Sequence, residues 1–154
     1  MTYRKLALAV ALGGLVVNAG CGGSSSSPTP TATPAPAPVT TTVASGTGVF
    51  NRNSTGRITD FTLTAAGTVT ATLRWTLATS DLDIWVLSGL TCSSVNVDTD
   101  VPQGTGCTIL CQDIGTTGTS ATCSFSAPAG SYRFWAANYS GTNETGSFTV
   151  TVTR

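Results

Sequence analysis

The sequence predicts an all-β protein: an antiparallel β-sandwich of seven to eight strands, jelly-roll-like in arrangement, that follows a disordered N-terminal tether. Three observations predict this fold class. Apolar and polar residues alternate with a period of two in several short runs, and clusters of glycine, asparagine and aspartate separate the runs. Only 9% of the residues are charged. Thr, Ser and Gly are abundant, a composition that favours strands and turns over helices.

The longest alternating run extends from Thr68 to Leu77 and predicts a half-buried strand with Trp75 on its inward face. Three further runs alternate in the same way. Their predicted inward-facing residues are Leu82, Ile84 and Val86 in the first, Tyr132, Phe134 and Ala136 in the second, and Phe148, Val150 and Val152 in the third. Shorter candidate strands lie at residues 48–51, 58–63, 108–112 and 121–126.

The N-terminus has the three parts of a secretory signal peptide, which we place at residues 1–20. Arg4 and Lys5 supply positive charge, an apolar run follows up to Val17, and small residues precede Cys21. The apolar run of about a dozen residues is too short to cross a bilayer as a helix, which takes about 20. The sequence therefore predicts an exported protein without a permanent transmembrane segment.

The segment Ala19-Gly20-Cys21 resembles the end of a bacterial lipobox, in which the cysteine thiol receives a diacylglycerol and becomes the mature N-terminus. The resemblance implies lipidation at Cys21, a palmitate-type modification, and an anchor in a membrane of the cell envelope, with the outer membrane or the cell surface as the expected place. The alternative is an ordinary secretory signal in which Cys21 is incidental. Two glycines and four serines directly after Cys21 favour the lipoprotein, because they have the composition of an unstructured spacer.

Residues 21–44 form the predicted linker, and residues 45–154 the predicted sandwich domain. Ser, Pro, Thr and Ala dominate the linker, with prolines at positions 28, 30, 34, 36 and 38. Such a segment buries too little apolar surface to fold, and alternating Ala-Pro favours an extended polyproline helix. We therefore expect the linker to act as a spacer between the membrane and the domain.

The composition disfavours several classes of function. Without the signal peptide the chain carries five basic and seven acidic residues and no lysine, so we expect no nucleic-acid partner. The absence of histidine removes the usual general base and the commonest metal ligand. The serines and threonines lack a basic partner that would activate them. The sequence therefore predicts a protein that is not an enzyme.

Four cysteines lie within the domain, and in an exported protein an even number indicates disulfides. A four-thiolate zinc site is the alternative, although the paired C-x₂-C spacing of such sites is missing. A turn near Thr99-Asp100 would bring Cys92 towards Cys107, and a hairpin centred on Thr117 would set Cys111 across from Cys123. We therefore predict the pairs Cys92–Cys107 and Cys111–Cys123.

Two tryptophans occupy the outward side of well-marked strands. Alternation places Trp85 and Trp135 opposite the apolar face, and Arg74 and Arg133 are expected nearby. An exposed aromatic platform of this kind would bind sugars or an extended polymer through its ring faces. The alternative is that the cysteine-bearing insert covers both indoles and makes a second small core.

Aspartates concentrate near one expected end of the sandwich. Asp81, Asp83, Asp98 and Asp100 provide carboxylates in D-x-D spacing, a donor set that suits Ca²⁺. No complete EF-hand loop is present, and aspartates at strand ends also serve to cap turns. We therefore predict no obligatory cofactor and keep a calcium site as a hypothesis.

The domain resembles the bacterial pre-peptidase C-terminal domain, a β-sandwich related to collagen-binding modules of clostridial collagenases. Three segments carry the resemblance: AGTVT at residues 66–70, SDLDIWV at residues 80–86, and APAGSYRF at residues 127–134. The insert from Thr91 to Thr122 is not part of the family pattern. The resemblance implies a non-catalytic binding module, and its collagen-binding relatives use calcium.

These observations together predict a lipid-anchored envelope protein whose sandwich binds a glycan or an extracellular matrix polymer. The alternative is a purely structural envelope protein with no dedicated ligand. An enzyme is the third and least favoured hypothesis.

Overall fold

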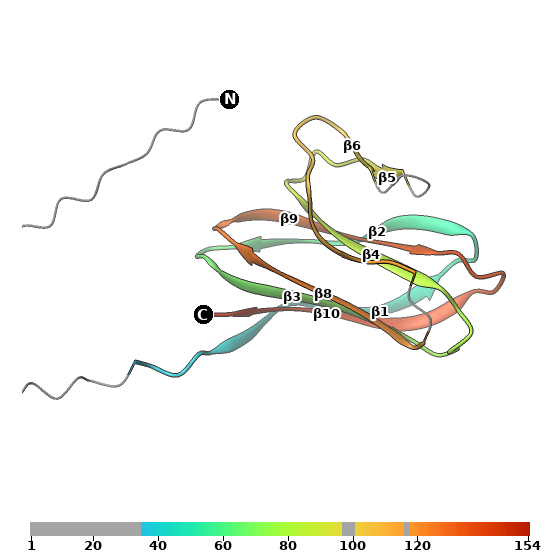
Figure 1. Ribbon diagram of the computed structural model, residues 1–154, viewed down its shortest axis with the longest axis horizontal. Coiled ribbons are helices and arrows are strands. Elements are labelled where there is room, and N and C mark those ends of the chain that lie inside the picture. The colour runs from blue at the N-terminus through green and yellow to red at the C-terminus, as the bar shows by residue number, and fades with distance from the viewer. Residues whose placement is uncertain (1–34, 97–100, 116–117) are drawn as a thin grey trace, which may run out of the picture. The chain divides into compact units, whose positions relative to one another are not determined.

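The computed structural model describes residues 35–96, 101–115 and 118–154, in which the folded unit begins at Pro36. All regular structure in these residues is β-strand (Figure 1). No helix among them is long and apolar enough to cross a membrane. The strands are β1 (Thr40–Phe50), β2 (Ser54–Leu63), β3 (Gly67–Trp75), β4 (Leu82–Ser88), β5 (Ser94–Asn96), β6 (Val101–Gln103), β7 (Ile109–Asp113), β8 (Ser120–Ala127), β9 (Gly130–Asn138) and β10 (Glu144–Thr153).

Eight of the strands form two four-stranded antiparallel sheets that face each other. Sheet A has the order β1-β10-β3-β8, and sheet B has the order β2-β9-β4-β7. Successive strands cross from one sheet to the other, except that β4 and β7 are neighbours in sheet B. This order, with the first and last strands paired in one sheet, is that of a jelly roll and confirms the predicted fold class.

The alternation predicted from the sequence fills the space between the sheets. The run from Thr68 to Leu77 corresponds to β3 as far as Trp75, and the inward-facing Val69, Ala71 and Leu73 are fully buried. Leu77 lies beyond the end of β3 and is 47% exposed, so the strand is shorter than predicted. Trp75 is 5% exposed and joins the same core. The inward-facing residues predicted for the other three long strands are also buried, apart from the half-buried Phe148. The main core is therefore the one that period-two patterning indicates.

The folded domain begins earlier than predicted. Strand β1 starts at Thr40, whereas the linker was expected to extend to residue 44. Thr40, Thr41 and Thr42 pair with the end of β10, and Val39 and Arg154 exchange backbone hydrogen bonds of 2.8 and 3.0 Å. The threonine-rich end of the linker becomes a strand because β10 offers it a partner. The predicted signal peptide and most of the predicted linker lie outside the described residues.

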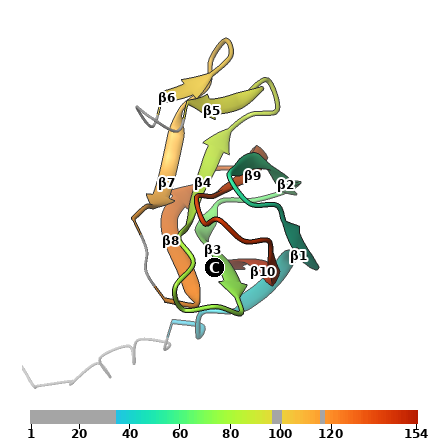
Figure 2. The ribbon, with the colours of Figure 1, turned by 90° about the vertical axis from the view of Figure 1, so that its right-hand side faces the viewer.

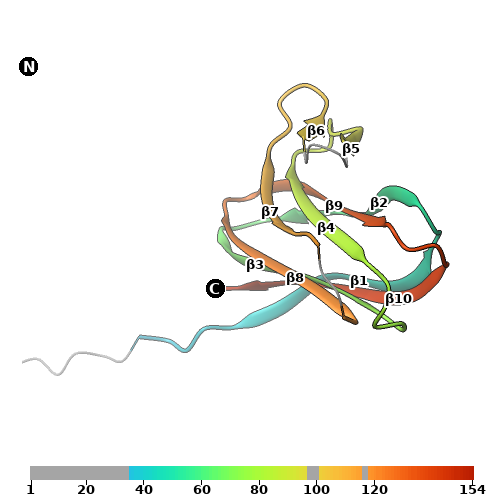
Figure 3. The same cartoon turned by 45° about the vertical axis from the view of Figure 1, so that its right-hand side comes forward.

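A small lobe, defined as the described residues between Gly89 and Thr108, connects β4 to β7. Its strands β5 and β6 pair with each other and form a separate two-stranded sheet. Figures 2 and 3 show this lobe standing off one side of the sandwich, at the ends of β4 and β7. The sequence did not predict β5 and β6, because strands of three residues are too short to show alternation.

Candidate functional site

The predicted aromatic platform is not a surface. Trp85 is fully buried and Trp135 is 7% exposed, so the expectation that both indoles face solvent was wrong. Both side chains do lie on the outer side of sheet B, but the lobe covers them. Cys92 and Val95 of the lobe pack with the two indoles, Leu87 and Ala137 into a second small core. This is the alternative that the sequence left open.

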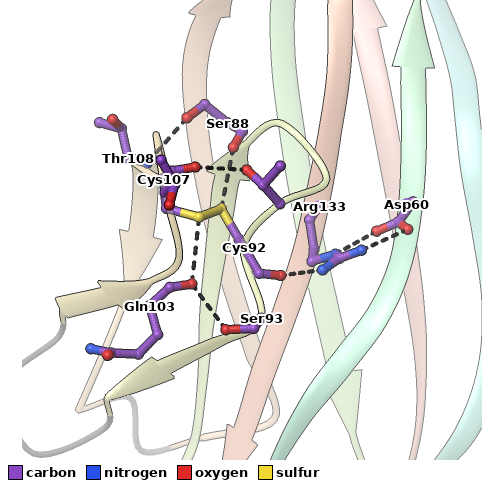
Figure 4. The surroundings of a disulfide bond; sticks show 10 residues. Asp60, Ser88, Cys92, Ser93, Gln103, Cys107, Thr108 and Arg133 are labelled. Atoms are coloured by element: carbon purple, nitrogen blue, oxygen red, sulfur yellow. Dashed lines mark hydrogen bonds and ion pairs between the residues drawn. A yellow bond between two sulfur atoms is a disulfide. The ribbon is translucent and has the colours of Figure 1, made fainter.

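The two arginines expected beside the platform are far apart in the fold. Arg74 is exposed on β3 in sheet A, whereas both tryptophans belong to sheet B. Arg133 lies on β9 in sheet B, and its side chain is 13% exposed. Its guanidinium binds the carboxylate of Asp60 and donates a hydrogen bond to the backbone carbonyl of Cys92 (Figure 4). Arg133 therefore attaches the lobe to the sandwich.

This ion pair changes the titration of both partners. The hydrogen bond from Arg133 is the main reason that the pKa of Asp60 lies below its ordinary value, and the charges of Arg133 and Arg57 add to the effect. The hydrogen bond to Asp60 likewise raises the pKa of Arg133. Arg57 contacts the same carboxylate at 3.0 Å from the exposed side. Asp60 therefore has two guanidinium partners, the half-buried one of Arg133 and the exposed one of Arg57.

Both predicted disulfides are present, but one has a different geometry from the one expected. Cys92–Cys107 closes the lobe, and the pairing of β5 with β6 brings the two cysteines together as predicted. Cys111 and Cys123 are also bonded, yet their strands do not form a hairpin. Strand β7 belongs to sheet B and β8 to sheet A, so this disulfide connects the two sheets.

The aspartates do not form a metal site within the described residues. No group of three histidine, cysteine, aspartate or glutamate side chains that could hold a metal ion occurs there. Asp83 is buried and accepts a hydrogen bond of 2.8 Å from the backbone N–H of Gly115. Asp98 and Asp100 lie outside the described residues, so the calcium hypothesis stays a prediction.

A buried carboxylate that the sequence did not single out connects β10 to the segment after β3. Glu144 is fully buried and accepts hydrogen bonds from the backbone N–H and hydroxyl of Thr76, the backbone N–H of Leu77, and the hydroxyl of Ser80. Burial raises the pKa of Glu144, but these four donors outweigh burial and hold the pKa below its ordinary value. With its oxygens occupied in this way, Glu144 supports the fold and offers no free general base.

The best candidate for a binding site is a cleft of about 380 Å³ between the edge strands β1 and β2, which we call the lateral cleft. It lies where the chain passes from sheet A to sheet B. Gly48 and Gly56 occupy inward-facing positions of these strands, and a Cβ atom at either would have no heavy atom of the described structure within 4 Å. A sandwich ordinarily packs side chains at such positions. The two glycines therefore leave the cleft open.

Apolar and polar residues both line the lateral cleft. Phe50, Ile58 and Phe148, three partly buried side chains packed against the core, supply its apolar surface together with Ala136. Thr47, Asn51, Ser54 and Arg57 line it as well and bring hydroxyl, amide and guanidinium groups. The lining is therefore about half polar and half apolar, and the volume lies in the usual range of ligand sites, about 300–1,000 Å³.

A second, smaller hollow of about 230 Å³ adjoins the cleft. The two share Ser54, Thr55 and Asn138, and the smaller one adds Asn53 and Tyr139, whose residue is 39% exposed. Asn138 itself is buried and fixes the neighbouring loops by donating to the carbonyls of Phe50 and Thr142. Cleft and hollow are therefore neighbours near the β1–β2 turn.

Sequence analysis missed this region, although a signal for it exists. The glycines at positions 46, 48 and 56 stand at inward positions of strands, where patterning calls for apolar side chains. Gly46 accommodates a neighbour, since a Cβ atom there would lie 2.8 Å from the ring of Phe148. No neighbouring side chain of the described residues fills the space beside Gly48 or Gly56. Only the structure distinguishes a glycine that makes room for a neighbour from a glycine that leaves open space.

The fold defines the chain as a jelly-roll β-sandwich with a disulfide-closed lobe. No protein-family model matches the sequence, and no curated protein matches it. Among solved structures the chain is similar to the Yersinia pseudotuberculosis-derived mitogen, with 17% sequence identity and a TM-score of 0.42 over 71% of this chain and 85% of that chain.

The chain is also similar to two structures of infectious bursal disease virus. For the T13 viral particle the identity is 14% and the TM-score 0.39, over 75% of this chain and 31% of that chain. For the Gx strain the identity is 13% and the TM-score 0.38, over 77% and 32%. This chain thus spans about a third of the virus chains. The strand order alone carries the assignment of the fold, and these likenesses carry no statement about function.

Proposed function

We propose that the chain is a non-catalytic lipoprotein of the cell envelope, anchored through Cys21, whose sandwich binds an extended polymer in the lateral cleft. A glycan and an extracellular matrix polymer are the two partner classes. The observation that carries the proposal is the cleft itself, which Gly48 and Gly56 keep open at inward-facing positions of β1 and β2. The exposed Tyr139 beside it adds an aromatic face of the kind that sugars use.

Export and anchoring rest on the sequence. The signal at residues 1–20, the lipobox-like ending at Cys21 and the proline-rich spacer support a lipid anchor, with the outer membrane or cell surface as the expected place. The two disulfides support an oxidising compartment outside the cytoplasm. Cys21→Ser is expected to abolish acyl labelling and detergent-phase partitioning. Wild-type protein recovered soluble and unacylated would contradict the anchor.

The resemblance to the pre-peptidase C-terminal domain supports the same class of function, a binding module joined to an exported protein. Under this proposal the domain needs no cofactor. Calcium remains a secondary hypothesis through Asp81 and Asp83, together with the aspartates at positions 98 and 100. Because the mature chain has more acidic than basic residues and no lysine, the proposal includes no nucleic-acid partner.

A retention assay on arrays of glycans and matrix proteins tests the proposal. Gly48→Leu places an apolar side chain in the cleft, and its Cβ atom would have no heavy atom of the described residues within 4 Å, so it should abolish retention and leave the thermal midpoint nearly unchanged. Gly141→Leu is the matched control, since Gly141 also has open space around its Cβ position but does not line the cleft. A purely structural envelope protein, the alternative, would show no retention on any array.

A further inference from the structure

We infer that the lateral cleft recognises an extended polypeptide, which adds as a new strand to the free edge of β1 and places alternate apolar side chains in the cleft. This inference rests on the proposed function and narrows its partner from a polymer to a peptide segment. The juxtaposition that carries it is an unprotected strand edge directly beside an open hollow with apolar side chains in its lining.

The backbone of β1 is available for pairing on one side. β1 is the edge strand of sheet A, and no other strand among the described residues pairs with its outer edge. Val39 and Arg154 form a reciprocal hydrogen-bonded pair. Along an antiparallel ladder such pairs alternate with pairs whose backbone groups point away. Continued through the irregularity between Thr42 and Ala44, this alternation directs the N–H and C=O groups of Ser45, Thr47 and Val49 to the free edge.

The other edges of the sandwich are protected. On β2, the exposed Arg57 and the half-buried Asp60 place charges along the strand, and the register shifts between Arg57 and Thr59. On β8, the Asp113 carboxylate accepts a hydrogen bond of 2.7 Å from the backbone N–H of Thr122, and the Cys111–Cys123 disulfide fastens the strand to β7. Strand β7 is only five residues long. An edge strand is usually kept from pairing with another chain by charged side chains, an irregular register, covering groups or a short length.

Strand β1 lacks these devices along its second half. Its eleven residues include no charged side chain and no proline, and its single register shift lies between Thr42 and Ala44. The stretch from Ser45 to Val49 is therefore regular, neutral and next to the lateral cleft. Val49 is 63% exposed, which leaves an apolar side chain at the same edge. A long neutral edge of this kind is a template for strand addition.

The cleft determines which side chains the added strand must have. Successive side chains of a strand point to opposite faces, so every second side chain of the incoming segment would point towards the space between the sheets. Gly48 leaves that space open, and Phe50, Ile58 and Phe148 supply apolar surface to it. A second copy of this chain does not satisfy it, because the inward-facing residues of β1 at positions 46 and 48 are glycines. The partner is therefore a different segment with apolar residues at alternate positions.

Two substitutions at one position separate backbone pairing from other contacts. Thr47→Pro removes the N–H that points to the free edge, and proline is tolerated at such positions of edge strands. Thr47→Ala removes the hydroxyl and keeps the N–H. The probe is a capped heptapeptide in which threonine and leucine alternate, and its control has the same composition with the leucines consecutive.

Titration by NMR should show shifts at Ser45, Thr47, Val49 and the residues of the cleft with the alternating peptide only, and slower amide exchange at the three edge residues. Thr47→Pro should bind the peptide roughly tenfold more weakly than Thr47→Ala, because both variants lack the hydroxyl and they differ by one backbone N–H donor. Gly48→Leu should abolish binding. Equal affinity for the two peptides would overturn the inference. Chemical shift changes confined to residues outside β1 and the cleft would overturn it as well.

The same variants separate this inference from the proposed function. If a glycan is retained, and Gly48→Leu abolishes its retention but Thr47→Pro does not, the cleft binds a polymer without strand addition, and the inference fails while the proposed function stands. If neither a peptide nor any glycan or matrix protein binds the wild-type chain, both fail. If the wild-type chain forms a dimer and Thr47→Pro dissociates it, the inference is also overturned, because β1 would then pair with β1 of a second copy.

Discussion

Arg133 donates two hydrogen bonds to the carboxylate of Asp60, with 2.8 Å between Nε and Oδ1 and 3.1 Å between Nη2 and Oδ2. The remaining guanidinium nitrogen reaches the backbone carbonyl of Cys92, so one side chain joins β2, β9 and the lobe. Bidentate pairs of this kind are among the strongest polar contacts in proteins. The lobe, which covers Trp85 and Trp135, therefore depends on a charged residue of the sheet beneath it.

Arg133→Met is expected to destabilise the domain by about 1–3 kcal/mol. It removes two hydrogen bonds to the Asp60 carboxylate, which keeps the one from Arg57, and it removes the hydrogen bond to the Cys92 carbonyl. Chemical denaturation measures this change. Arg74→Met is the matched control, since Arg74 is exposed and should stay within about 0.5 kcal/mol of the wild type. Equal stability of the two variants would show that the Arg133 contacts contribute nothing.

Stability should fall as the pH is lowered, through the low-pKa carboxylates. Glu144 and Asp60 both have a pKa below the ordinary values of 4.5 and 3.8. A group with a depressed folded-state pKa stabilises the fold fully above its unfolded pKa and loses this contribution as the pH falls through the folded pKa. Denaturation midpoints should therefore be flat above about pH 5 and decline below it.

Glu144→Gln identifies the part of this decline that belongs to Glu144. The amide keeps the shape of the side chain but cannot titrate, and its nitrogen cannot accept the hydrogen bonds that the carboxylate receives. The variant should be less stable at pH 7, and its stability should vary less between pH 5 and pH 3. A profile parallel to that of the wild type would assign the acid sensitivity to other carboxylates.

Replacing either covered indole should cost as much as replacing a residue of the main core. Trp85→Ala and Trp135→Ala are each expected to lower stability by about 3–5 kcal/mol, as for Trp75→Ala. Trp135→Phe should cost less, since it keeps most of the ring volume and loses the 2.6 Å hydrogen bond from Nε1 to the Thr55 hydroxyl. Thermal melts measure these changes. If Trp85→Ala and Trp135→Ala are as stable as the wild type, the lobe packs only loosely over the two indoles.

Residue alternation predicted the main core because parity along a strand depends only on local spacing. It also placed Trp85 and Trp135 correctly on the outer side of sheet B. What covers that side is decided by the lobe, a segment without periodicity, so exposure could not be predicted from the strand itself. The partner of a strand is likewise not visible in the strand's own sequence. The end of the linker is therefore predicted to be disordered, although Thr40–Thr42 pair with β10.

The cysteine pairs illustrate how a correct pairing can follow from an incorrect geometry. Cys111 and Cys123 are twelve residues apart, a separation that suits a hairpin within one sheet and equally a crossing between two sheets. Only the strand order distinguishes these cases. The lateral cleft was missed on similar grounds, because Gly48 and Gly56 come from different sheets and their common open space is a tertiary property.

The two disulfides provide the last prediction, because they close loops of similar length and hold different parts of the fold. The sequence separations are 15 and 12 residues, so the chain-entropy account assigns each about 3 kcal/mol. The double variants Cys92→Ala/Cys107→Ala and Cys111→Ala/Cys123→Ala should therefore lose similar stability. Their native states should differ, since only the first disulfide closes the lobe over Trp85 and Trp135.

In the lobe variant, tryptophan fluorescence of the folded protein should shift to longer wavelength and become accessible to iodide quenching, because the indoles gain contact with water. In the inter-sheet variant the emission should match the wild type until global unfolding, as the lobe and its Arg133 contact remain. Each variant thus controls for the stability loss of the other. Identical emission from both folded variants would mean that Arg133 and packing hold the lobe closed without its disulfide, and a red shift confined to the inter-sheet variant would contradict the described second core.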